Sequence, residues 1–151
     1  VPCKTWDNAS LLCSATAPGG DSFPLSIKTH RIAPGQKNTW FTEVLGTRAS
    51  ARWSSANPNM LELMEFDGGE QSFRAIQTGY TPAFKTITGG IFEFGFTDSI
   101  LQMWAAFVYE LAMGKPLKKF AGCVTPEETH LTHRLFTAAL QSQAHETVVP
   151  V

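Results

Sequence analysis

The segment from Thr97 to Gly114 constrains the fold of this 151-residue chain more than any other. Its large apolar residues recur three and four positions apart, which predicts one helix with a wide apolar face. These residues are Ile100, Met103, Trp104, Phe107, Val108 and Leu111. Thr97 is predicted to cap the first turn, and Gly114 is predicted to end the helix before Pro116. Because so wide an apolar face needs burial, we expect this helix to lie on a sheet.

Six short segments ahead of this helix have the composition of β-strands. Turns rich in Gly, Pro, Asn and Asp separate them, and several alternate apolar with polar residues. The predicted strands are residues 9–17, 23–30, 39–45, 48–54, 60–66 and 71–78. Short turns between successive strands predict antiparallel pairing. The stretch from Gly79 to Gly95 has no regular period and is predicted to be an ordered loop.

The last part of the chain predicts a second helix and a closing strand. Thr125 is a suitable cap, Pro126 suits the first helical position, and Glu128 lies three residues after the cap. The β-branched segment Thr147–Val151 is predicted to add an edge strand. The fold class expected from all these elements is α+β: a largely antiparallel, open-faced sheet of about six strands with two main helices packed on one face.

Composition bounds the class of protein. The length fits one domain, residues 1–151, and the net charge of −1 gives no indication of a nucleic-acid or membrane partner. No apolar run is long enough to span a bilayer, and no signal-peptide pattern is present. Three cysteines predict reduced thiols and a cytoplasmic location, with a Cys3–Cys13 disulfide as the alternative. Since the chain does not begin with Met, we expect Val1 to follow further sequence in a longer protein.

Two interpretations are open for the polar residues at the end of the second predicted strand. His30 and Arg31 precede a Pro-Gly turn, and Trp40 follows it, a combination that suits an anionic or polyhydroxylated ligand. Alternatively, the two basic residues form a polar sheet edge that pairs with Glu43 or Glu65. The complete set of predicted substrate-binding residues is His30, Arg31, Trp40, Tyr80 and Lys85.

Other patterns indicate no cofactor, metal or catalytic residue in this chain. No dinucleotide fingerprint, phosphate loop or nucleophile elbow occurs. Glu127 and His130 form half of a di-iron motif, but a solvated helix face is the favoured interpretation. Glu93 and Asp98 flank the start of the long helix and could form a general acid–base pair, although helix capping by Asp98 is favoured.

The series of elements resembles the C-terminal domain of the glucose–fructose oxidoreductase / inositol dehydrogenase / rhizopine catabolism (Gfo/Idh/MocA) family. Residues 5–9 resemble the first strand of that domain, and residues 38–53 resemble its strand–Gly–strand hairpin, with Ala49 where Gly is common. The segment from Phe96 to Gly114 resembles its helix. Thr125–Ser142 and Val148–Val151 resemble its closing helix and final strand.

The resemblance implies a substrate-binding and oligomerisation domain of an NAD(P)-dependent oxidoreductase that acts on a sugar or cyclitol-like alcohol. It also implies that NAD or NADP and the catalytic residues belong to an N-terminal nucleotide-binding domain absent from these residues. A homo-oligomer through the open sheet face is expected, because the family's helices cover only the other face. The alternatives are a non-enzymatic carbohydrate- or protein-binding sheet module and a purely structural oligomerisation domain.

Overall fold

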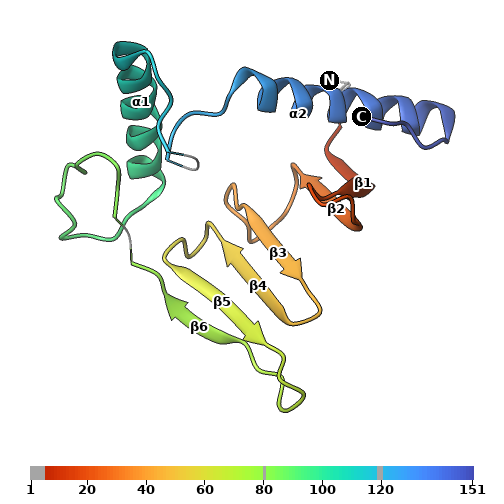
Figure 1. Ribbon diagram of the computed structural model, residues 1–151, viewed down its shortest axis with the longest axis horizontal. Coiled ribbons are helices and arrows are strands. Elements are labelled where there is room, and N and C mark those ends of the chain that lie inside the picture. The colour runs from red at the N-terminus through yellow and green to blue at the C-terminus, as the bar shows by residue number, and fades with distance from the viewer. Residues whose placement is uncertain (1–5, 80, 119–120) are drawn as a thin grey trace. The chain divides into compact units, whose positions relative to one another are not determined.

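The computed structural model describes residues 6–79, 81–118 and 121–151 (Figure 1). The strands are β1 (Asn8–Thr16), β2 (Ser22–His30), β3 (Phe41–Leu45), β4 (Ala49–Ser54), β5 (Met60–Glu65) and β6 (Arg74–Gln77), and the helices are α1 (Phe96–Met113) and α2 (Pro126–His145). All strand pairs are antiparallel, so the predicted α+β class is confirmed. The chain divides into two compact units, one of Val1–Gln36 with Pro126–Val151 and one of Lys37–Thr125.

In the first unit, β1 and β2 form a hairpin that is paired along its whole length, from Asn8 opposite His30 to Thr16 opposite Ser22. The predicted turn is present, since the amide of Gly20 donates to the carbonyl of Ala17 at 2.9 Å. Gly20 has a φ of 91°, a conformation that glycine adopts without strain.

In the second unit, β3, β4, β5 and β6 form a four-stranded sheet in sequence order (Figure 1). The six predicted strands therefore lie in two sheets rather than one. The reason lies between β2 and β3, where no tight hairpin turn is present. The chain instead turns at Ala33–Gln36, with an amide–carbonyl hydrogen bond of 3.0 Å, and continues without regular structure to Trp40.

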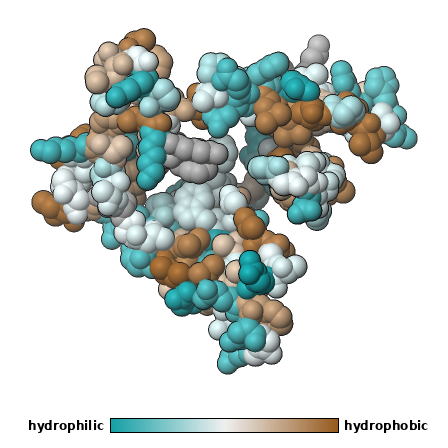
Figure 2. All heavy atoms as spheres, viewed as in Figure 1, coloured by the Kyte–Doolittle hydropathy of each residue, from teal (hydrophilic) through white to brown (hydrophobic). Residues whose placement is uncertain are grey.

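The strand register separates the two faces of this sheet. One face carries Glu43, Arg52 and Glu62 in a cross-strand row, with the Arg52–Glu43 ion pair at 2.6 Å. The opposite face, called here the apolar sheet face, carries Val44, Ala51, Trp53, Leu61, Leu63 and Ile76. The Glu65–Arg74 ion pair lies beside Leu63 on the same face. Hydrophobic residues are visible at the surface over the four-stranded sheet in Figure 2.

Helix α1 has the predicted end but not the predicted start. Gly114 takes the left-handed conformation with φ 63° and ends the helix as expected. The N-cap is Gly95, whose amide donates to the Asp98 carboxylate at 3.0 Å. The predicted cap at Thr97 is therefore wrong, because Asp98 satisfies the amide at the helix start and winding begins at Phe96.

Loops, rather than strands, hold α1 in the second unit. Within each unit, the substantial contacts between regular elements of the described residues are all between neighbouring strands, so neither helix has the expected packing on the sheet of its own unit. The Glu110 carboxylate instead accepts hydrogen bonds from the amides of Leu117 at 2.8 Å and Cys123 at 3.4 Å. Ala106, 1% exposed, is the most buried apolar residue of the described chain.

Helix α2 begins at Pro126 as predicted, but the closing strand does not form. The amide of Thr147 donates to the carbonyl of Ser142 at 3.2 Å, and its carbonyl accepts from the Ser142 hydroxyl at 2.6 Å. Both backbone groups of Thr147 are thus used locally, and the residues after it have no strand conformation. The β-branched composition of Thr147–Val151 therefore gave the wrong prediction.

Candidate functional site

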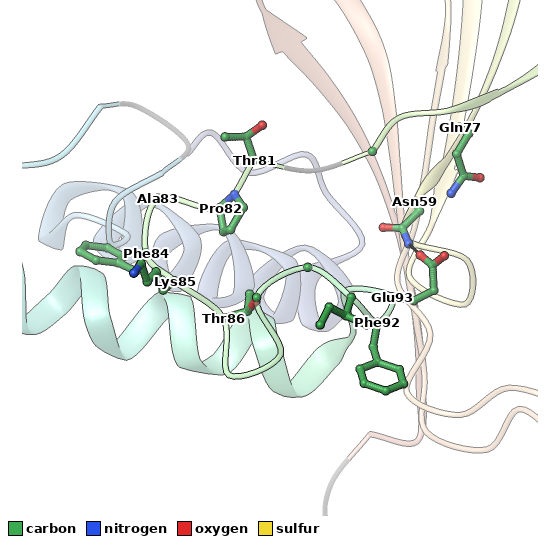
Figure 3. A pocket seen from close by; sticks show the side chains of 14 residues that line it. Asn59, Gln77, Thr81, Pro82, Ala83, Phe84, Lys85, Thr86, Phe92 and Glu93 are labelled. Atoms are coloured by element: carbon green, nitrogen blue, oxygen red, sulfur yellow. Dashed lines mark hydrogen bonds between the residues drawn. The ribbon is translucent and has the colours of Figure 1, made fainter.

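A cavity with a volume of about 590 Å³ lies within the second unit (Figure 3). Three segments form it: the residue before β5, the end of β6, and the loop that follows β6. Its polar lining residues are Asn59, Gln77, Thr81, Lys85, Thr86 and Glu93, and Phe84 and Phe92 add aromatic surface. The volume is within the usual range for a small-molecule site.

Helix α1 fixes one end of the loop that lines the cavity. The side-chain amide of Gln102 accepts the Phe84 N–H at 2.9 Å and donates to the Phe84 carbonyl at 2.8 Å. The Phe84 ring also meets the Tyr109 ring edge-on, with centroids 5.8 Å apart. Because Gln102, Ala106 and Tyr109 recur at helical spacing, they share the face of α1 that holds the loop.

The start of β5 fixes the other end of the loop. Asn59 is 8% exposed, and its side-chain amide donates to the Glu93 carboxylate, as the dashed line in Figure 3 shows. The backbone carbonyl of Asn59 accepts from both the amide and the hydroxyl of Thr78, at 2.8 and 3.0 Å. The Asn59 side chain is therefore held in one orientation, and it positions Glu93 across 34 residues of sequence.

This arrangement offers hydrogen-bond donors and acceptors of several kinds. The side-chain amides of Asn59 and Gln77 can donate and accept hydrogen bonds, and so can the hydroxyls of Thr81 and Thr86. The Glu93 carboxylate accepts hydrogen bonds. Such a mixture next to aromatic rings suits a ligand with several hydroxyl groups.

Of the five predicted binding residues, Lys85 alone is placed at this cavity among those that the structure describes. Trp40 belongs to the same unit but does not line the cavity; the residue is 66% exposed, and its backbone amide donates to the Ser55 hydroxyl at 2.8 Å. Tyr80 lies outside the described residues.

His30 and Arg31 belong to the first unit, at the end of β2. The His30 ring is hydrogen-bonded to the Asn8 side chain at 3.0 Å, and Arg31 lies 3.9 Å from Asp7. Glu43 and Glu65, the acidic partners expected from the sequence, belong to the second unit, where Glu43 pairs with Arg52 and Glu65 with Arg74. The β1–β2 register places Asn8 opposite His30, which explains why the His30 ring is hydrogen-bonded to the Asn8 side chain.

The general acid–base pair is also not formed. Asp98 caps α1, as favoured from the sequence, while Glu93 is bonded to Asn59. Cys123 is a poor nucleophile, because partial burial, followed by the charge of the nearby Glu110, raises the pKa of its thiol above the usual value. The thiol of Cys13 is free, and Cys3 lies outside the described residues.

On α2, His130, His133 and Arg134 line a second cavity of about 320 Å³. Nowhere in residues 6–79, 81–118 and 121–151 do three or more His, Cys, Asp or Glu side chains gather to hold a metal ion. In the same ranges, no helix is both long enough and apolar enough to cross a bilayer.

Sequence reasoning missed Asn59, Gln77 and Gln102. Gln102 did give a signal, as a lone amide within an apolar helix, where a buried polar group requires a partner. Asn59 and Gln77 gave no such sequence signal, because turns and strand ends often carry side-chain amides. Their role depends on Glu93, which is distant in the sequence.

No family model matches this chain, and no curated protein is significantly similar to it in sequence. Among solved structures, the chain is similar to the crystal structure of an oxidoreductase domain protein from Kribbella flavida, with a TM-score of 0.70 and 21% sequence identity. The match covers 97% of this chain but 38% of that protein. The chain therefore has the fold of one part of an oxidoreductase domain protein, and it spans well under half of that protein's length.

Proposed function

We propose that this chain is the substrate-binding and oligomerisation domain of an NAD(P)-dependent oxidoreductase that acts on a sugar- or cyclitol-like alcohol. The observation that supports this most is the fold match, in which nearly the whole chain corresponds to 38% of an oxidoreductase domain protein. The remainder of such a protein has room for a nucleotide-binding domain that holds NAD or NADP. In this proposal the loop cavity contributes to binding the alcohol substrate, and the catalytic residues lie in the other domain.

The proposed role predicts that the purified chain binds polyols without converting them. We expect myo-inositol or glucose to shift the amide resonances of Thr86 and Glu93 in an NMR titration, with a dissociation constant on the order of 1 mM, because the cavity is open and a neutral polyol forms no ion pair in it. Gln77→Met should weaken this binding severalfold, whereas Gln71→Met, in the turn before β6, should leave it unchanged.

Two results would contradict this assignment. Turnover of a polyol by the chain with NAD or NADP would place catalytic residues here, and a complete lack of polyol or sugar-acid binding would remove the substrate-binding role. The coding sequence before Val1 gives a further test. A strand followed by Gly-x-Gly-x-x-Gly, then Glu-Lys-Pro and Asp-x-x-x-His, would support the oxidoreductase; a start codon at that point would favour a binding module.

We also propose self-association through the apolar sheet face. Its support is a row of aliphatic residues that ends at Val44, 62% exposed on the edge strand β3, since contiguous apolar surface commonly marks an interface. Light scattering and cross-linking should find an oligomer that Val44→Asp dissociates. Leu12→Asp, at an exposed site on β1, should leave the oligomer intact. A stable wild-type monomer over a wide concentration range would exclude this interface.

A further inference from the structure

The charges of the loop cavity are separated along its length. Figure 3 shows Lys85 beside Phe84 at one end, and Asn59, Gln77 and Glu93 together at the other. One end therefore offers a cation, and the other offers amides and a carboxylate.

The backbone on both sides of Lys85 is fixed. Phe84 is held through its N–H and its carbonyl by Gln102, and Thr86 is buried, with its carbonyl accepting from the Gly89 amide at 3.3 Å. The loop thus presents Lys85 from a defined position rather than from a free chain.

Lys85 also has no counterion within the described part of the chain. Its ammonium group is in none of the ion pairs there, which join Arg31 to Asp7, Arg52 to Glu43, and Arg74 to Glu65. The acidic residue that lines the cavity, Glu93, is engaged by Asn59. The cavity therefore contains a positive charge that an anionic group of a ligand can pair with.

Building on the proposed function, we infer that the substrate class of this site is acidic: a sugar or polyol that carries a carboxylate, such as a hexuronate. Its hydroxyl groups occupy the end formed by Asn59, Gln77 and Glu93, and its carboxylate lies at Lys85. A carboxylate suits the site better than a phosphate group. Among the described lining residues there is neither an arginine nor a helix N-terminus, the two features that commonly hold phosphate.

The test compares ligands of matched shape. Glucuronate, glucose and glucose 6-phosphate are titrated into the whole chain by NMR at one ionic strength. We expect glucuronate to bind about threefold to tenfold more tightly than glucose, with the difference reduced by added salt, because the new ion pair is exposed. Lys85→Gln should remove this preference for glucuronate over glucose. Lys115→Gln is the control, since it removes the same charge from the same unit outside the cavity.

Each contrary result points to a different conclusion. Equal affinity for glucuronate and glucose would overturn the acidic class while the polyol-binding role stands. A preference that persists in Lys85→Gln would overturn the role of Lys85, and tighter binding of glucose 6-phosphate than of glucuronate would overturn the choice of carboxylate. Binding of none of the three would contradict the proposed function itself.

Discussion

Replacement of Gln102 by Met is expected to release the cavity loop from α1 and to lower the free energy of unfolding by about 2–3 kcal/mol. Met has nearly the volume of Gln, so packing against the loop is preserved. The change removes both hydrogen bonds to Phe84 and leaves a half-buried N–H and carbonyl without their partner. Urea denaturation measures the loss of stability, and hydrogen exchange at the Phe84 amide measures release of the loop.

Two further variants separate the hydrogen bonds from other effects of this substitution. Gln143→Met makes the same chemical change at an exposed site on α2 and should alter stability by less than about 0.5 kcal/mol. Gln102→Glu keeps an acceptor for the Phe84 N–H but places a carboxylate oxygen against the Phe84 carbonyl oxygen, so its loss of stability should be no smaller than that of Gln102→Met. If Gln102→Met leaves both the hydrogen exchange of the Phe84 amide and the free energy of unfolding at their wild-type values, Gln102 does not hold the loop.

The same variant connects stability to ligand binding. Lys85 follows Phe84 directly, so a loop that is detached at Phe84 no longer presents the Lys85 ammonium from a fixed position. Ligand affinity should fall together with protection of the Phe84 amide, because the loop must be reordered when the ligand binds.

The positions of the strands and helices were predictable because their signals are local. Gly114 ends α1 through its own left-handed conformation, and Pro126 begins α2 because its fixed φ suits the first helical position. Turn residues likewise bounded every strand to within a few residues. In each case the physical cause acts within one turn of the chain, where a sequence pattern can report it.

The predictions were wrong where the structure depends on a residue that is distant in the sequence, or on a choice between competing hydrogen-bond partners. The division into two sheets depends on which strand β2 and β3 pair with, and the failed closing strand depends on Ser142 taking both backbone groups of Thr147. The cavity residues show the same difference between local and long-range signals. Lys85 could be named as a cation in a loop, but the Asn59–Glu93 bond joins residues whose proximity is set only by the folded unit.

Gly46→Ala is expected to destabilise the β3–β4 hairpin by about 1–3 kcal/mol. A Cβ atom at Gly46 would lie 2.7 Å from the Ala49 carbonyl oxygen, the atom that accepts the Gly46 amide at 2.9 Å. The obstacle is backbone, so no side chain can rotate away. The turn must instead open, which lengthens the hydrogen bond that closes the hairpin and disturbs the pairing of Leu45 with Ser50. Urea denaturation, with hydrogen exchange at the Gly46 position, measures the effect.

Gly19→Ala is the matched control, in the turn of the β1–β2 hairpin. Its added Cβ would meet nothing within 4 Å, and its φ is not in the left-handed region, so it should be neutral or slightly stabilising through the lower entropy of the unfolded chain. Equal destabilisation by both substitutions would show that any alanine in a hairpin turn has this effect. A loss confined to Gly46→Ala would show that the close approach to Ala49 is what requires glycine there.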